Sequence, residues 1–150
     1  MSKNFSDAIA YKIHKAVFVM DKTADSTLQE KLNLTLSQFL ILMSIEQNPN
    51  LTQVEIARFL ELTQAAVSRQ IDVLKNKNLI TISQNEKNRR ENLLFPTLKG
   101  KEIFTKADKI LHETFETLYK VMDEKEKENL EKSLDKLLST VCGKKRTIDC

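Results

Sequence analysis

Two threonine-capped helical segments, joined by a very short turn, constrain this chain more than any other feature. In the first, LTQVEIARFLEL, Thr52 is followed three residues later by Glu55. This spacing is a capping box, in which each side chain bonds the other's backbone N–H. In the second, LTQAAVSRQIDVLKNKNLI, Thr63 is the predicted N-cap, and Val67, Ile71 and Leu74 recur at helical spacing. Because the turn is so short, the two helices must meet at a sharp angle.

The period of the apolar residues changes immediately afterwards. The stretch LITISQ alternates at period two and is rich in β-branched residues, which indicates a strand. NLLFP is predicted to be its antiparallel partner, and the polar loop NEKNRRE joins the two. Helical spacing returns from Thr97 through residue 122 and again up to residue 141. Ahead of the hairpin, TLSQFLILMSIEQ predicts a helix capped by Thr35 or Ser37, which ends before Pro49.

The N-terminal segment predicts a long helix with one apolar stripe over residues 5–20. TADSTLQEKLNL either continues this helix or forms a linker. Only two glycines and two prolines occur in 150 residues, and 41% of the residues are apolar, so we expect a mostly α-helical protein with a real core. No apolar run is long enough for a signal-peptide core or a membrane span, so we expect a cytoplasmic location and no membrane association.

The positive charge is concentrated in one region. Residues 63–91 contain six lysines and arginines against three acidic residues, which equals the net charge of +3 of the whole chain. Such a local excess is typical of a phosphate-binding surface, although a solvated helix and loop would explain the charge equally well.

The order of the predicted elements favours a winged helix-turn-helix. An α-helix fits the DNA major groove, and a basic loop reaches the minor groove beside it. On the 63–77 helix, the side opposite the apolar residues contains Ala65, Ser68, Arg69, Asp72 and Asn76. Asp72 is negative against DNA, and we expect it to pair with Arg69 or with Lys75.

The chain resembles the MarR family of bacterial transcriptional regulators. The resemblance rests on LTLSQFLILMSI, on the two capped segments and on NEKNRRENLLFPTLKGKEIF, which together span residues 35–104. The family's wing usually reads Asp-x-x-Asp-Arg-Arg, whereas Asn85 and Asn88 replace both aspartates here. We therefore expect Arg90 to be held less firmly. Asn78 stands where the family usually has Gly, and Glu61 occupies the helix-turn-helix turn, where older motifs prefer Gly.

The resemblance implies a homodimer that reads a pseudo-palindrome in double-stranded DNA, with half-sites roughly 34 Å apart. It divides the chain into an N-terminal dimerisation helix and linker (1–34), a DNA-binding lobe (35–100), and C-terminal dimerisation helices with a short tail (101–150). The residues that we expect at the DNA are Gln53, Thr63, Gln64, Ala65, Ser68, Arg69, Lys75, Lys87, Asn88, Arg89 and Arg90.

The resemblance also implies a repressor that is released by a small-molecule or oxidative signal. The family's effector crevice lies between the dimerisation helices and the DNA lobe. Residues that would contribute to it for a small aromatic or similar effector are Tyr11, His14, Phe39, Met43 and His112, although each of them alone fits a plain core or interface role better. Cys142 and Cys150 would be the redox candidates, and inert tail thiols are the competing interpretation.

No metal site is expected, because His14 and His112 lack metal-ligand spacing. No cofactor and no enzymatic activity are expected either, since the sequence lacks a Gly-rich phosphate loop and a nucleophile elbow. The remaining alternative is a winged-helix module that binds another protein and not specific DNA.

Overall fold

The computed structural model describes residues 8–48, 50–85, 88 and 92–141. Six helices and one antiparallel hairpin follow one another along the chain: α1 (Ile9–Leu32), α2 (Leu36–Gln47), α3 (Gln53–Phe59), α4 (Gln64–Asn76), β1 (Ile80–Gln84), β2 (Asn92–Pro96), α5 (Leu98–Tyr119) and α6 (Glu124–Val141). The expected class, a mostly helical winged helix-turn-helix fold with N- and C-terminal helices outside the lobe, is confirmed.

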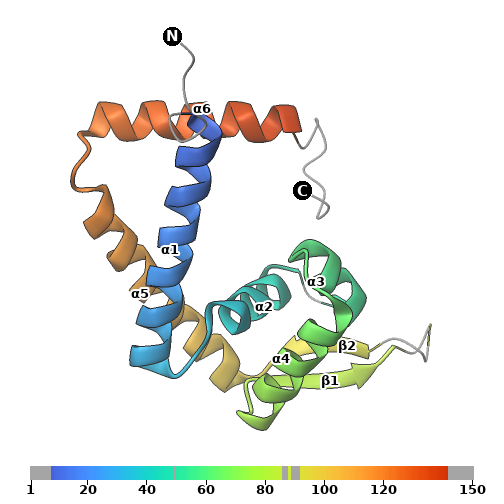
Figure 1. The fold of residues 1–150 in the computed structure, drawn as a ribbon. Helices are drawn as coiled ribbons and strands as arrows, with labels where there is room; N and C mark the ends of the chain where they lie inside the picture. Colours follow the sequence, from blue (N-terminus) through green and yellow to red (C-terminus); the bar gives the residue numbers. More distant parts are fainter. Residues whose placement is uncertain (1–7, 49, 86–87, 89–91, 142–150) are drawn as a thin grey trace.

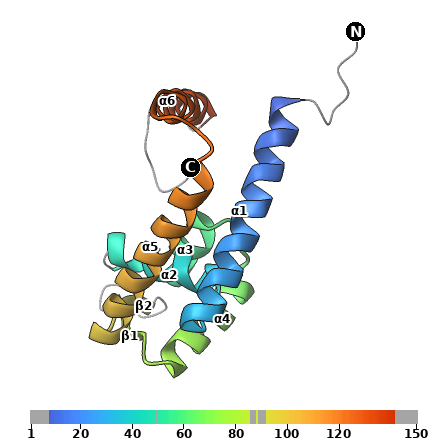
Figure 2. The ribbon, with the colours of Figure 1, turned by 90° about the vertical axis from the view of Figure 1, so that its left-hand side faces the viewer.

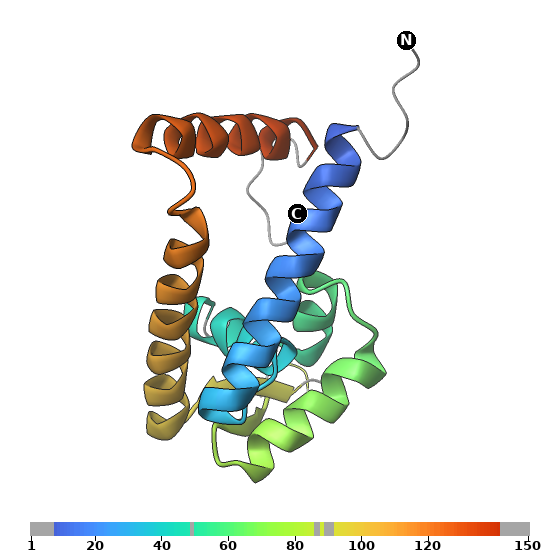
Figure 3. The ribbon, with the colours of Figure 1, turned by 60° about the vertical axis from the view of Figure 1, so that its left-hand side comes forward.

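The elements form a compact lobe with a long helical extension. Helices α2, α3 and α4 and the hairpin cluster together, and α1 and α5 run away from this cluster (Figures 1 and 3). Turned by 90°, the molecule shows α6 end-on at the far end of this extension (Figure 2). Every described side chain from residue 128 to residue 140 is exposed, so α6 contributes nothing to the core of the chain.

Four helices begin at a threonine whose hydroxyl accepts a bond from the backbone N–H three residues later. The distances from the donor nitrogen are 3.2 Å at Thr35, 3.2 Å at Thr52, 3.2 Å at Thr63 and 2.9 Å at Thr97. At α2 the cap is thus Thr35 and not Ser37. Each hydroxyl satisfies one of the backbone donors that a helix start leaves unpaired. The predicted helix starts are confirmed.

Left-handed residues terminate three of the helices. Asn33, Glu61 and Asn78 have φ values of 51°, 52° and 58° and follow α1, α3 and α4, respectively. After α3 and α4, two backbone bonds close the end in the Schellman pattern: at α3, the N–H of Glu61 donates to Arg58 and that of Leu62 to Ala57. Asparagine tolerates this conformation, but glutamate adopts it at a cost.

Helix α1 is continuous through Leu32, which decides the open question of a linker at residues 23–34. Its buried residues are Ala24 and Leu28, both in the C-terminal half. By contrast, the described part of the predicted apolar stripe faces outward: Ile9 is 74% exposed and Val17 is 50% exposed. The stripe exists, but this chain alone does not cover it.

The hairpin pairs Ile80 with Pro96 and Gln84 with Asn92, which confirms the two predicted strands as antiparallel partners. A third segment joins its edge, which the sequence pattern did not indicate. Thr52 forms an isolated antiparallel bridge with Leu93, and the N–H of Leu94 donates to the carbonyl of Leu51 at 3.3 Å. The start of α3 is therefore bonded directly to the wing.

The core lies between α2, α4, the hairpin and the lower halves of α1 and α5. Its fully buried large side chains are Leu28, Leu34, Ile41, Leu42, Ile45, Ile56, Val67, Leu74, Ile80 and Leu94. Gly100, in the first turn of α5, lies so close to the backbone of Leu79 that a methyl group there would meet its carbonyl. No helix in the described part of the chain is both long and apolar enough to cross a membrane.

Candidate nucleic-acid interface

Helix α4 has one buried side and one exposed side. Val67, Ile71 and Leu74 are buried against the lobe, as their spacing predicts. On the opposite side, Ala65 and Arg69 are exposed, and Ser68 is half-buried. The helix is thus fixed through its inner face, while its outer face presents small and polar groups to the outside.

The N-terminal end of α4 is built to accept negative charge. Its first turn contains no acidic side chain, so the positive end of the helix dipole is not neutralised from within. Gln64 and Thr63 are exposed there. Gln53, which is half-buried at the start of α3, donates from Nε2 to the carbonyl of Gln64 at 3.3 Å. Gln53 therefore ties the two helices together at the turn, in addition to any contact of its own with a ligand.

The charged residues of α4 are not engaged with one another. Arg69, Asp72 and Lys75 are all exposed. Among the residues that the structure describes, no ion pair involves Asp72, so the expected pairing with Arg69 or Lys75 is absent. The carboxylate remains on the outer face of the helix, where it can accept a hydrogen bond.

The wing is described at its base but not over most of its tip. Asn88 is exposed, and its backbone N–H donates to the carbonyl of Asn85 at 3.2 Å. Lys87, Arg89 and Arg90 lie outside the described residues. Their proposed contacts with DNA therefore stay predictions.

The capping box of α3 affects the ionisation of its carboxylate. The Oε2 atom of Glu55 accepts the backbone N–H and the hydroxyl of Thr52, both at 2.8 Å. The backbone hydrogen bond from Thr52, followed by the one from its side chain, lowers the pKa of the Glu55 carboxyl group below its ordinary value. The start of the first helix of the motif is thus stabilised most when Glu55 is ionised.

The five residues predicted to line an effector crevice are dispersed along α1, α2 and α5. Phe39 is buried in the core and stacks on Phe104, with ring centroids 5.7 Å apart. His14 and His112 are exposed, and Tyr11 and Met43 are half-buried. None of the five lines the pocket described below. Cys142 and Cys150 lie outside the described residues.

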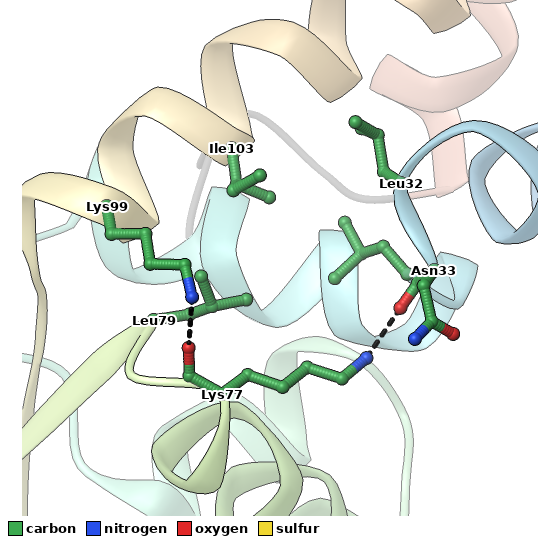
Figure 4. A pocket seen from close by; sticks show the side chains of 7 residues that line it. Leu32, Asn33, Lys77, Leu79, Lys99 and Ile103 are labelled. Carbon is green, nitrogen blue, oxygen red and sulfur yellow. Dashed lines mark hydrogen bonds between the residues drawn. The ribbon is translucent and has the colours of Figure 1, made fainter.

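A small pocket of about 180 Å³ lies between the C-terminal ends of α1 and α4 and the start of α5 (Figure 4). Its walls combine four aliphatic side chains with Asn33, Lys77 and Lys99. Sequence reasoning counted Lys77 only as positive charge and overlooked Lys99. Lys77 and Lys99 line the pocket together with residues that are distant in the sequence, so no local sequence pattern identifies either lysine as a pocket residue. Within the described ranges, no cluster of three or more His, Cys, Asp or Glu side chains could hold a metal ion.

Comparisons with known proteins agree with this architecture. The family model described as "MarR family" matches residues 34–92. YybA of Bacillus subtilis, an uncharacterised HTH-type transcriptional regulator, is 33% identical over 73 residues, and the match spans 49% of each protein. The chain thus covers about half the length of that relative. BilQ of Clostridium symbiosum, also an HTH-type transcriptional regulator, is 28% identical over 120 residues, which cover 77% of this chain and 83% of BilQ.

Solved structures match over most of the chain. Apo MarR from E. coli superposes with a TM-score of 0.83 at 26% identity, over 90% of this chain and 99% of MarR. A mutant of MarR complexed with operator DNA superposes with a TM-score of 0.76 at the same identity, over 91% and 99% of the two chains. The likeness therefore includes the extension formed by α1, α5 and α6 as well as the lobe.

Proposed function

We propose that this chain, which belongs to the MarR family of transcriptional regulators, binds double-stranded DNA as a homodimer. Helix α4 enters the major groove, and the wing lies along the neighbouring minor groove. The observation that carries this proposal is the two-sided character of α4. Its inner residues are buried, its outer face is small and polar, and its first turn lacks an acid.

The outer face of α4 suits base recognition. Ala65 leaves room for close approach in the first turn, and Arg69, one turn later, can form a bidentate pair with guanine or hold a phosphate. Asp72 can accept from the amino group of cytosine, which gives this exposed carboxylate a use at a DNA surface. We assign phosphate contacts to Thr63, Gln64 and the wing, because helix starts and basic loops are common phosphate-binding elements.

Exposed apolar surface on α1, after α5 and on α6 supports the proposed homodimer. Large apolar side chains are exposed on three parts of the extension: Ile9, Val17 and Phe18 on α1, Val121 after α5, and Leu130, Leu134, Leu137 and Leu138 on α6. Apolar surface of this extent is normally covered by another protein chain. A second copy of this chain would bring two α4 helices to one face of the DNA. Residues 1–34 and 101–150 would then form the dimerisation region and residues 35–100 the reading lobe.

We further propose that the chain acts as a repressor whose DNA binding is released by a small-molecule effector. The effector would bind between the extension and the lobe, near Tyr11, His14, Phe39, Met43 and His112. The half-buried state of Tyr11 and Met43 is compatible with such a site. Release from DNA by a small-molecule ligand and release by oxidation can be tested in one screen, in which small aromatic acids and mild oxidants are added and the loss of DNA binding is measured.

Selection of bound sequences from a random duplex pool tests the central proposal. We expect a pseudo-palindromic consensus and a steep loss of affinity between 50 and 200 mM salt, about 10³-fold or more for six or more phosphate contacts. Arg69→Ala should weaken binding about 5- to 100-fold and relax the preference at one base position. The control is Lys136→Ala on α6, which removes the same charge from an exposed site far along the chain. If the selection enriches no duplex sequence and the affinity of the chain for DNA does not change with salt, the result would favour the alternative that the chain is a winged-helix module that binds another protein.

A further inference from the structure

A connected set of polar side chains lies where α1, α2 and α4 converge. We call it the polar joint and define it as Asn33, Gln38, Gln70 and Lys77. Gln38 donates from Nε2 to Oε1 of Gln70 at 3.0 Å. The ammonium group of Lys77 donates to Oε1 of Gln38 at 3.2 Å and to the backbone carbonyl of Asn33 (Figure 4 draws the bond to Asn33). The joint therefore bonds Gln70 of α4 and the C-cap residue Lys77 to Gln38 of α2 and to Asn33 at the end of α1.

Gln38 is the centre of this network. It is only 5% exposed, and its Oε1 atom also accepts the backbone N–H of Thr35 at 3.3 Å. Every buried side-chain nitrogen and oxygen in the described part of the chain has a hydrogen-bond partner. A buried amide that loses its partners is costly, whereas aliphatic side chains tolerate sliding. The amide is thus satisfied only within a narrow range of orientations of α4 against α2.

The C-terminal end of α4 is held from a third direction. Lys77 is the C-cap residue of α4, and its backbone carbonyl accepts the ammonium group of Lys99 in α5 at 2.9 Å (Figure 4). The next carbonyl, that of Asn78, accepts the hydroxyl of Thr97 at 2.7 Å. Bonds from α1, α2 and α5 therefore converge on this one helix end. Within the part of the chain that the structure describes, the opposite end of α4 accepts one hydrogen bond from outside the helix and its cap, from Nε2 of Gln53 to the carbonyl of Gln64.

We propose that Gln70 and Lys77 are positioning residues that fix the angle of the recognition helix α4 relative to α1. Because α1 belongs to the dimerisation region, this angle determines how far apart two α4 helices lie and hence which spacing of DNA half-sites the dimer accepts. The inference about half-site spacing rests on the proposed function, whereas the inference about the helix angle does not. The polar joint acts through helix placement, and its residues do not need to touch DNA.

Two variants test the joint without touching the fully buried core. Gln70→Leu removes the partner of Gln38 without a change of charge, and Lys77→Met removes both bonds of the ammonium group. Both side chains are half-buried, so they can be exchanged with a smaller risk to folding. The matched control is Lys106→Met, which makes the same change of charge at an exposed position of α5, outside the polar joint and outside the residues that we expect at the DNA. Thermal unfolding identifies a variant that fails to fold. If one of the two test variants does not fold, the measurements on the other one decide whether the proposal holds.

The helix angle is measured by the distance between spin labels on exposed positions of α1 and α4, Lys15 and Asp72. Cys142 and Cys150 are replaced by serine beforehand, and excess unlabelled chain restricts the signal to pairs within one chain. We expect one narrow distance distribution for the otherwise unchanged protein and for Lys106→Met. For Gln70→Leu and Lys77→Met we expect a shifted or broadened distribution. Distributions that match the reference in both variants would overturn the proposal.

The consequence for DNA is measured with duplexes whose half-sites are moved apart or together by one base pair. We expect the ratio between the best and the next spacing to fall about fivefold in both variants, the factor that corresponds to one net hydrogen bond. The control variant should keep the ratio. A changed label distance with an unchanged ratio would refute the link to spacing. If the unsubstituted chain binds no duplex, the proposed function fails, and the label distance alone decides on the joint.

Discussion

Replacing Gly100 by alanine should destabilise the protein, although helix propensity favours the change. Gly100 lies in the first turn of α5, where alanine is about 1 kcal/mol better than glycine. A Cβ atom at this position would lie 1.9 Å from the carbonyl oxygen of Leu79 and 3.0 Å from its carbonyl carbon. Both are backbone atoms, so no rotamer change relieves the contact. The gap must open by about 1.5 Å before ordinary contact is reached.

The required movement also disturbs the hydrogen bonds around the start of α5. The carbonyl of Leu79 accepts the N–H of Thr97 at 3.0 Å, and the hydroxyl of Thr97 accepts the N–H of Gly100 at 2.9 Å. Overpacking of a tight site costs about 1–3 kcal/mol, and loss of an N-cap costs about 1 kcal/mol. After the gain in propensity is subtracted, the expected loss is about 2 kcal/mol, which lowers the Tm by about 4–8 °C at this chain length.

Urea and thermal unfolding, followed by circular dichroism, measure this loss in Gly100→Ala. The control is Lys106→Ala, an exposed position of the same helix, which should stay within about 0.5 kcal/mol of the unsubstituted protein. A Gly100→Ala protein as stable as the unsubstituted one, or more stable, would refute the argument from close approach. Propensity would then outweigh the contact with Leu79.

Three other substitutions have defined outcomes. Glu55→Ala should cost about 1 kcal/mol at pH 7 by removing the two hydrogen bonds that the carboxylate accepts from the backbone N–H and the hydroxyl of Thr52. Because the folded-state pKa of Glu55 is lowered, this contribution is present above the ordinary pKa of 4.5 for this carboxyl group and is lost as the pH falls through the lower folded-state pKa. Urea unfolding at pH 7 and pH 3 should show the cost shrink, and a constant cost would contradict the assignment. Glu61→Gly should raise the free energy of unfolding by about 0.5–1 kcal/mol, since φ is 52° there, and an equal or lower value would argue against backbone strain. Leu134→Glu should shift sedimentation from dimer to monomer, while Lys132→Glu on the same helix leaves it unchanged; a stable dimer in the first variant would place the interface elsewhere.

Local features of the fold were predictable because the interactions that create them span only a few residues. The hydroxyls of Thr35, Thr52, Thr63 and Thr97 each bond a backbone N–H three residues away, so the sequence alone locates the helix starts. The two paired strands were predictable in the same way from their alternation and the polar loop between them, and the buried face of α4 was predictable from its helical period.

Interactions across long stretches of sequence were not predictable in this way. Gln38 and Gln70 are 32 residues apart, and Lys77 and Asn33 are 44 apart. A buried glutamine looks like any polar residue of a helix until the partner helix is in place. The predicted ion pair of Asp72 with Arg69 or Lys75 was wrong although its residues are close in sequence. Its spacing permits a bond that two exposed and solvated side chains gain little by making.

The bridge between Thr52 and Leu93 has a mechanical consequence. Main-chain bonds at this point, together with the one from Leu94 to Leu51, couple the hairpin to the entrance of the helix-turn-helix without using any side chain. Outward-facing residues of α4 and of the hairpin tip can therefore be substituted, in evolution or by design, without changing the position of the hairpin relative to the helix-turn-helix. Target preference and lobe geometry are thus separable properties of this chain, and a new preference requires no new scaffold.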